Sequence, residues 1–403
     1  MSLLRRIFKP KEQQEQRAMT TRDPEGWRDI LGPLTSSGVH VTPTTALGVP
    51  AALRAVTLLS GAVASLPLKV YRRTSDGREP AADSMAYKLL HEAPNPMQTP
   101  FTFKELIMNH LLLSGNFIAY IDWQGGKPAA LWPMDPAAVT IDQDRDTGAV
   151  TYRVSTAKGQ QILRPNEVLH ILGMTLDGVR GLSPITLARE SLGGAIAELE
   201  HGQSFFKNGA AVGGVLEHPG HLGPEAAETL RQSWRDKYSG PNNAGKVAVL
   251  EEGMEFKPVA LSNKDSQWLE SRQVSVLDVA RIFGVPPALL GHLEKASYSS
   301  QEAQNLEFLT HSLRPWLSRI EQAVNRAILG GDLYAEFTTG DMVRTTLDKR
   351  YNAYRVALAA GFMTVNEVRQ LENLPAVAGG DDLYRPLNMG LLGEEESIDG
   401  EGN

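Results

Sequence analysis

Residues 299–331, SSQEAQNLEFLTHSLRPWLSRIEQAVNRAILGG, carry the strongest helical pattern in the chain. Ser299 and Glu302 have the spacing of a capping box, and an apolar residue recurs every three or four positions until two glycines end the pattern. About 29 residues at ~1.5 Å each predict a helix roughly 40 Å long. Pro315 lies inside this helix and cannot donate a backbone hydrogen bond, so the sequence predicts a kink near residues 311–315.

Two further helices are predicted on the N-terminal side of this stretch. The first, SPITLARESLGGAIAELEHGQSFFKNG, begins with Ser183 as its N-cap and Pro184 in its first turn. The second, DSQWLESRQVSVLDVARIFG, ends at Gly284, and the Val-Pro-Pro that follows prevents it from continuing.

Two adjacent glycines, Gly193 and Gly194, lie in the middle of the first of these helices. Each costs about 1 kcal/mol relative to alanine in a helix interior. Either this cost is simply tolerated, or another helix packs so closely that a Cβ atom would clash. The second interpretation suits helices crowded side by side around a ring.

The rest of the chain mixes helical and strand patterns. Residues 1–40 lack periodicity and predict a flexible arm, whereas residues 41–183 alternate helix and strand signals. After the long helix, YAEFTT predicts a strand, residues 341–390 predict two helices around Gly361, and residues 391–403 predict an acidic disordered tail. These patterns together predict an α+β fold.

Composition limits the classes of function. The chain has 403 residues, no cysteine and a formal net charge of -7. The lack of cysteine excludes disulfides and Cys-ligated zinc, and it fits a reducing cytoplasm. No apolar run is long enough for a membrane span, so no membrane partner is expected. A conventional nucleic-acid binder would carry a basic excess, so contact with DNA must come from a few residues repeated around an assembly.

Residues 240–247, GPNNAGKV, fit the first seven positions of a phosphate-binding loop. However, Val247 stands where the motif needs a serine or threonine hydroxyl for magnesium. The preceding residues 224–240 predict a helix and the following residues predict strands, which reverses the order of elements that such a loop requires. An Asn/Gly-rich turn is therefore the better interpretation.

Other motifs that suggest chemistry are also weak. Asp142, Asp144 and Asp146 have calcium-loop spacing, but the glycine falls one place late and Arg153 stands where a glutamate is needed, so a hairpin turn is favoured. The pair His218 and His221 lies in a turn, which makes metal binding unlikely on spacing. His170 ends a predicted strand and is expected to make a structural hydrogen bond. We therefore expect no metal, no cofactor and no catalytic residue.

The ordered set of segments over residues 45–390 resembles the HK97-type portal family of tailed bacteriophages. The segments that carry this resemblance are LLLSGNFIAYI, EVLHI, GVRGLSPI, FFKNGAAVGGVLEHPGHL, AGKVAVLEEGMEFKPV, DSQWLESRQVSVLDVARIFGVPPALLG, LRPWLSRIEQAVNR and GFMTVNEVRQLENLPAVAGGDDLYRPLN. No single string is decisive, but their order along the chain is specific.

The resemblance implies a portal fold divided into named regions. It implies a wing, two stem helices, a clip, a tunnel loop, a long kinked helix with a returning wing strand, and crown helices. The corresponding residues are 41–183 for the wing, 184–210 and 263–290 for the stem, 211–262 for the clip, 291–300 for the tunnel loop, 301–340 for the long helix and strand, and 341–390 for the crown.

The resemblance also implies function and partners. A portal is a ring, expected to be a dodecamer, at one capsid vertex, through which double-stranded DNA is packaged and later ejected. The implied partners are the terminase large subunit, a head–tail adaptor protein, and the major capsid and scaffold proteins. Asn242, Asn243 and Lys246 would then lie on the clip docking surface, and the family does not hydrolyse ATP.

In a portal, the tunnel loop would face DNA. Residues 263–330 carry seven basic and seven acidic side chains, a balance that lets a duplex slide. Lys295 is the only cation of the loop and a ring would repeat it around the duplex, although an ordinary solvated lysine is equally compatible with the sequence. Tyr298 and Ser299 complete the candidate channel residues; Tyr298 could contact the DNA backbone or pack beneath the loop.

Two alternatives remain open from the sequence. One is an enzyme, either a nucleotide hydrolase using residues 240–246 or a metal-dependent nuclease using the Asp142–Asp146 cluster. The other keeps the ring but places it in a gene-transfer particle or a defective prophage.

Overall fold

The computed structural model describes residues 34–75, 77–156, 159–207, 214–238, 249–250, 253–258, 275–292, 304–339, 347–372 and 374–383. The chain divides into two compact units, Met1–Thr338 (unit 1) and Thr339–Asn403 (unit 2). Among the described residues, none of the helices has the length and apolar character to span a membrane.

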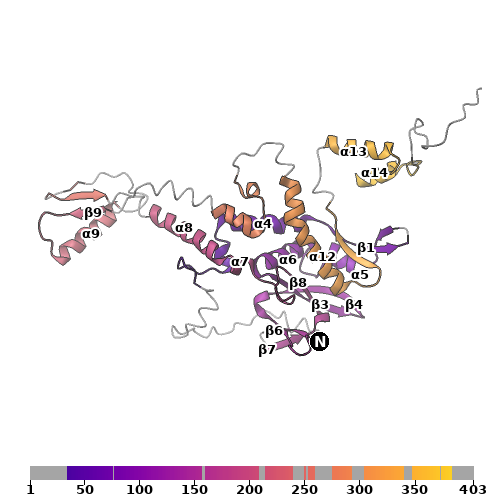
Figure 1. Ribbon diagram of the computed structural model, residues 1–403, viewed down its shortest axis with the longest axis horizontal. Helices are drawn as coiled ribbons and strands as arrows, with labels where there is room; N and C mark the ends of the chain where they lie inside the picture. The colour runs from indigo at the N-terminus through magenta and orange to yellow at the C-terminus, as the bar shows by residue number, and fades with distance from the viewer. Residues whose placement is uncertain are drawn as a thin grey trace, which may run out of the picture. The chain divides into compact units, whose positions relative to one another are not determined.

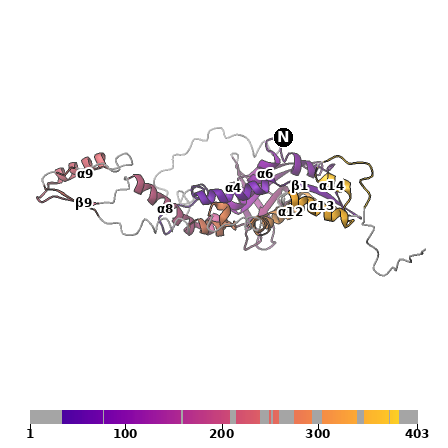
Figure 2. The ribbon, with the colours of Figure 1, turned by 90° about the horizontal axis from the view of Figure 1, so that it is seen from above.

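The centre of unit 1 is built on two helices, α4 (Pro50–Ser65) and α6 (Pro100–Ser114), which pack side by side (Figures 1 and 2). Each begins with proline, whose fixed φ suits the first helical turn. Thr99 caps α6 by accepting a hydrogen bond from the Thr102 amide. Unit 1 also contains short helical elements: α3 (Pro43–Ala46), α5 (Met85–Tyr87), the π turn η1 (Lys88–Glu92), and the 3-10 turns η2 (Pro136–Ala138), η3 (Pro165–Glu167) and η5 (Pro287–Leu290).

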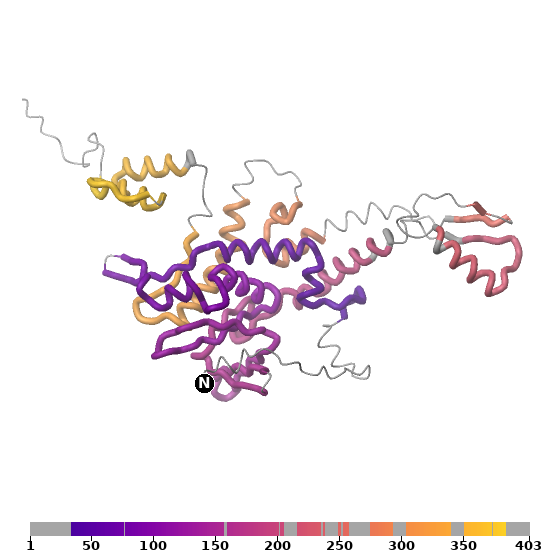
Figure 3. Tube along the Cα trace, turned by 180° about the vertical axis from the view of Figure 1, so that it is seen from behind, coloured from indigo at the N-terminus to yellow at the C-terminus, as the bar shows by residue number. Residues whose placement is uncertain are grey.

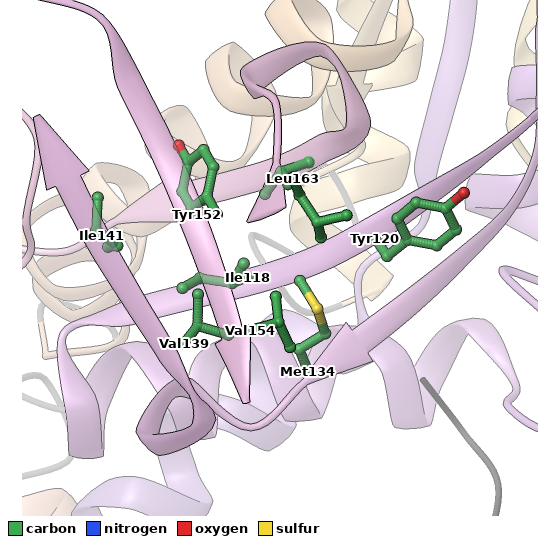
Figure 4. Close-up of a cluster of buried hydrophobic side chains, with 9 residues drawn as sticks. Ile118, Tyr120, Met134, Val139, Ile141, Tyr152, Val154 and Leu163 are labelled. Atoms are coloured by element: carbon green, nitrogen blue, oxygen red, sulfur yellow. The ribbon is translucent and has the colours of Figure 1, made fainter. Parts of the chain in front are cut away.

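Two three-stranded antiparallel sheets enclose the core cluster beside these helices. The first has the order β4-β3-β8, with β3 (Asn116–Gln124) between β4 (Lys127–Met134) and β8 (Val168–Leu172). The second has the order β5-β6-β7. Its strands are β5 (Val139–Gln143), β6 (Val150–Thr156) and β7 (Gly159–Leu163). Their inward side chains form one cluster (Figure 4), which consists of Ile118, Tyr120, Met134, Val139, Ile141, Tyr152, Val154, Leu163 and Val168.

A third sheet joins distant parts of the sequence. Its order is β11-β1-β2, with β1 (Leu68–Thr74), β2 (Gly77–Pro80) and β11 (Leu333–Phe337). The strand predicted from YAEFTT thus returns to the first part of the chain, where Phe337 pairs with Leu68. Helix α12 (Arg314–Ile328) holds it there, because Asn325 Oδ1 accepts a 2.7 Å hydrogen bond from the Ala335 amide.

The long predicted helix is described from residue 304 and changes its hydrogen bonding along its length. A π-helical segment, η6 (Phe308–Leu313), precedes α12, and Pro315 is the second residue of α12. The wider π turn falls where the sequence predicts a kink, next to the one residue without an amide proton. The Ser312 hydroxyl of this segment donates to the Gly284 carbonyl at the end of the helical segment 275–283.

The helix predicted from Ser183 is present as two pieces. α7 (Pro184–Leu187) and α8 (Arg189–Lys207) are separated at Ala188, whose φ of -98° and ψ of 17° leave the helical region. The predicted N-cap is confirmed: Ser183 Oγ accepts from the Thr186 amide. Figure 3 follows the chain from α7 into α8.

Residues 214–258 form a helix and a two-stranded sheet. α9 (Pro224–Tyr238) confirms the predicted helix, and Trp234 on it stacks on Phe256 with 5.5 Å between ring centroids. β9 (Gly214–Glu217) pairs antiparallel with β10 (Glu255–Pro258). Asn242, Asn243 and Lys246 lie outside the described residues.

Unit 2 contains α13 (Leu347–Ala359) and α14 (Val365–Leu371), the two helices predicted around Gly361. Gly361 has a φ of +71°, a conformation that glycine adopts without strain. Thr364 and Glu367 form a capping box at the start of α14.

Candidate functional site: the polar junction at the base of α8

Three glycines bring separate segments of unit 1 into backbone contact. Gly115 ends α6 with a φ of +76°, and its carbonyl accepts a 2.8 Å hydrogen bond from the Gly173 amide. A Cβ atom on Gly181 would lie 1.8 Å from the Gly115 oxygen, and one on Gly115 would lie 2.3 Å from the Leu182 oxygen. Only glycine fits at these positions, and the result is a close crossing where α6 ends and α7 begins.

Asn116, the next residue, fastens this crossing with its amide group. Its Oδ1 accepts from the Gly181 amide at 2.7 Å, and its Nδ2 donates to the carbonyls of Gly181 at 2.8 Å and Ser114 at 3.2 Å. The side chain thus adds a link to residues 181 and 114 beside the backbone pairing of β3 with β8, which begins at Asn116. The Asn116 side chain is partly buried, and hydrogen bonds from both of its polar atoms offset the cost of removing them from water.

His170 on β8 extends the network into the second sheet. Its Nε2 lies 3.0 Å from Asn116 Oδ1 and its Nδ1 lies 3.1 Å from Tyr152 Oη. Since Oδ1 only accepts, Nε2 carries the proton and Nδ1 accepts from the tyrosine hydroxyl. Burial lowers the pKa of His170 to about 4, so the ring is neutral at physiological pH. The expected structural hydrogen bond is confirmed, and the ring serves in two of them.

Two arginines complete the junction by donating to carbonyls. Arg319 on α12 donates from Nη1 to the Gly173 carbonyl at 2.7 Å, and Arg180 donates to the Ile141 carbonyl at 2.8 and 3.0 Å. Ser183 Oγ donates to the Leu113 carbonyl of α6 at 2.7 Å while capping α7. The junction, defined as Gly115, Asn116, His170, Arg180, Gly181, Ser183 and Arg319, thus ties α6, β8, α12 and the second sheet to the start of α7.

Above this junction, the N-terminal segment packs on α8. A Cβ atom on Gly193 would lie 2.7 Å from Thr35 Oγ1, and Glu190 accepts from the Ser36 amide at 3.0 Å. Residues 34–40, assigned to the arm from sequence, therefore form a turn against the helix. A Cβ atom on Gly194 would meet nothing within 4 Å. The two glycines therefore differ: Thr35 fills the space beside Gly193, whereas the space beside Gly194 is open.

The other candidate residues do not form a reactive site in the described part of the chain. Asp142 forms an ion pair with Arg153 at 2.7 Å across β5 and β6, and Asp144 accepts from the Asp146 and Thr147 amides, which confirms the hairpin turn. His218 bonds within its own turn to Gly220. No cluster of metal-ligating residues occurs among the residues described. Lys295, Tyr298 and Ser299 lie outside them.

Known proteins share this sequence and this fold. The phage portal protein family model matches residues 50–373. The probable portal protein of Streptomyces phage phiC31 is 36% identical over 399 residues, covering 94% of this chain and 86% of its own length. The portal protein of Enterobacteria phage HK97 is 29% identical over 368 residues, covering 88% of this chain and 86% of its own.

A solved neck of a native gene transfer agent particle, computed with C12 symmetry, has a TM-score of 0.58 to this chain. It is 24% identical, and the match covers 83% of this chain and 92% of that one. The α+β fold is thus the portal fold. The chain belongs to the phage portal protein family, and its relatives place it with the HK97-type portals.

Proposed function

We propose that copies of this chain form a closed ring at one vertex of a phage-type capsid and conduct double-stranded DNA. The observation that carries the proposal is the family match over residues 50–373, which spans the junction and the helices on either side of it. The junction supports it physically. A helix lining a channel needs a rigid base. α8 continues from α7, and partly buried hydrogen bonds of the junction tie the start of α7 to the elements around it.

The ring is expected to be a dodecamer, in keeping with the C12 symmetry of the similar neck. The terminase large subunit would dock on the clip through Asn242, Asn243 and Lys246, and a head–tail adaptor would follow it. Lys295, Tyr298 and Ser299 would face the DNA, and the major capsid and scaffold proteins would surround the ring. The site of action would be the virion, with assembly in the host cytoplasm.

Electron microscopy of the purified full chain tests the ring directly. We expect closed rings with a central channel wide enough for a duplex. A protein that stays monomeric at high concentration, or a ring whose residues near Lys295 lie on the outer rim, would contradict the proposal.

We also propose that the chain has no catalytic role of its own. Lys246→Ala addresses the nucleotide-hydrolase alternative, with Lys237→Ala on α9 as a matched lysine control. ATP turnover by the purified protein should be at background for the unchanged chain and both variants. Turnover that disappears only in Lys246→Ala would establish the enzyme instead.

A further inference from the structure

The sheet of order β11-β1-β2 in unit 1 buries one face and leaves the other face accessible. Side chains alternate between the two faces of a strand, and on β1 Leu68 and Val70 belong to the buried face. The other face carries six polar or aromatic residues, which are Lys69, Tyr71, Arg73, Arg78, Tyr334 and Glu336. We call these six residues the cationic face. None of the six is buried, and Arg73 and Arg78 are exposed.

Two tyrosines form the base of the cationic face. Tyr71 and Tyr334 are directly opposite in register, and their ring centroids lie 5.8 Å apart. The guanidinium carbon of Arg78 lies 4.5 Å from the centroid of Tyr71. That of Arg73 lies 5.1 Å from the centroid of Tyr334. Stacking on a ring orients a guanidinium group and leaves its N–H edge available to a carboxylate.

The two neighbouring arginines of β1 differ in their partners. Arg72 belongs to the opposite face from Arg73 and lies within 3.5 Å of three carboxylates, those of Glu79, Asp83 and Asp332. Among the residues that the structure describes, no carboxylate lies in ion-pair range of Arg73. The charge of Arg73 is therefore not used within this part of the chain.

The position of Arg73 in the sheet makes its charge unfavourable for folding. Arg73 pairs directly with Arg78 across the two strands. This is a position without a ladder hydrogen bond between the two residues, where opposed side chains are closest, and like charges there destabilise a sheet. Glu336 forms an ion pair with Arg78, so only one of the three cations of the face is neutralised. Arg73 and Lys69 remain to attract an anionic partner.

We infer that the cationic face binds an extended acidic peptide segment of a partner protein. Lys69 and Arg73 are four residues apart on one strand, which is about 13 Å at ~3.3 Å per residue. Two carboxylates four residues apart in an extended peptide have the same spacing, so such a segment lying along β1 can pair with both cations. Tyr71 lies midway between them and offers ring surface to an apolar side chain between the two carboxylates.

A peptide fits this surface better than single-stranded nucleic acid does. Bases bind to such surfaces by stacking on aromatic rings. Here an arginine already lies over each tyrosine ring, so a base would have to displace a guanidinium group to stack there. The inference concerns a surface of unit 1 and does not depend on the proposed ring.

Fluorescence anisotropy with the full chain tests this binding. The probe is a labelled peptide with two glutamates four residues apart and a valine midway, and its match carries glutamines in place of the glutamates. We expect the glutamate peptide to bind at least about fivefold more tightly than the glutamine peptide, and added salt to reduce this difference. Equal affinity for the two peptides would overturn the inference.

The matched variants are Arg73→Glu and Arg145→Glu, which make the same change in net charge. Arg145 is an exposed arginine in the turn after β5. Arg73→Glu should lower the affinity for the glutamate peptide at least about tenfold, because attraction becomes repulsion, whereas Arg145→Glu should change it less than about twofold. Equal losses of affinity in the two variants would overturn the inference. Tighter binding of a single-stranded oligothymidylate than of the glutamate peptide would overturn it in favour of nucleic acid.

Thermal unfolding separates a binding role of Arg73 from a structural one. Since Arg73→Glu places a carboxylate opposite Arg78, the midpoint of thermal unfolding should stay the same or rise. Arg73→Gln removes the charge without reversing it and should lower the affinity for the glutamate peptide about fivefold in a stable protein. A stable Arg73→Gln variant that binds this peptide as tightly as the unchanged chain would overturn the inference.

Discussion

His170 connects the junction to pH. In the unfolded chain a histidine titrates near pH 6.5, whereas burial holds the folded pKa at about 4. Between these values the unfolded state binds more protons, so the free energy of unfolding falls as the pH is lowered. We expect this group to cost about 2 kcal/mol at pH 5 relative to pH 7. Chemical unfolding of the full chain at the two pH values measures it.

The variant comparison for this prediction is His170→Gln against His311→Gln. His311 is exposed in the π-helical segment. Although His170→Gln lowers stability at pH 7, it should remove most of the difference between pH 7 and pH 5. If the stability difference between pH 7 and pH 5 were equal in both variants, groups other than His170 would be its cause.

Gly181 gives a second prediction at the scale of one residue. In Gly181→Ala the new Cβ atom would lie 1.8 Å from the Gly115 oxygen, so the backbone crossing must open. We expect a loss of about 3 kcal/mol, at the upper end for overpacking. Gly61→Ala in α4 is the control, because nothing lies within 4 Å of its Cβ position and the helix gains propensity. Thermal unfolding of the two variants should shift in opposite directions.

The residues of the junction show where sequence reasoning reaches its limit. His170 could be assigned a structural hydrogen bond because it belongs to a predicted strand and no catalytic motif stands out in the sequence. Its partner Asn116 is 54 positions away in sequence, and Arg319 reaches a carbonyl 146 positions away. No periodicity or motif links such residues. The single local signal for the junction was Gly115, the glycine next to Asn116, where α6 ends.

At the scale of elements, α8 gives opposite expectations for two neighbouring glycines. Gly193→Ala would push a Cβ atom to 2.7 Å from the Thr35 side chain and should cost about 1–3 kcal/mol. Gly194→Ala meets nothing within the chain and should stabilise the monomer by up to about 1 kcal/mol through helix propensity. Thermal unfolding of the unassembled protein measures both. Similar shifts in both variants would contradict the assignment of the two faces.

Two further variants complete this test. Thr35→Gly should lower stability by itself, because the Thr35 hydroxyl bonds to both the amide and the carbonyl of Val39. In that background, however, Gly193→Ala should cost less than it does alone, because the side chain that meets the new Cβ atom is gone. Gly194→Leu should leave the monomer helical and impair ring assembly, since we expect the open face of α8 at Gly194 to face a neighbouring subunit of the ring. Normal rings from Gly194→Leu would show that Gly194 does not lie in the subunit contact.

Elements with a strong local pattern were predictable, whereas hydrogen-bonding details were not. α9, α13 and α14 appear where capping residues and apolar spacing indicate them. The break at Ala188 and the π turn before α12 keep nearly the same apolar spacing as a continuous helix, so the sequence does not distinguish them. Strands such as β4 and β7 were missed because their alternation is weak and their pairing partners supply the stability.

At the scale of the whole molecule, a ring changes what a single charge can do. The chain is acidic overall, and residues 263–330 are balanced in charge, so one copy should hold DNA only weakly. In a dodecamer, Lys295 would be presented many times around one duplex. The same multiplication applies to a substitution, and a small change per copy becomes a large change per ring.

Lys295→Glu should therefore weaken DNA association of assembled rings strongly while leaving ring formation intact. Each lost phosphate contact lowers the salt dependence of binding by about one in the slope of log K against log salt. We expect both the affinity and this slope to fall, measured by titrating rings with a short duplex at several salt concentrations. Lys127→Glu, an exposed lysine at the start of β4, is the control with the same change in net charge. Equal losses of DNA affinity in the two variants would indicate a general charge effect and would contradict the placement of Lys295 in the channel.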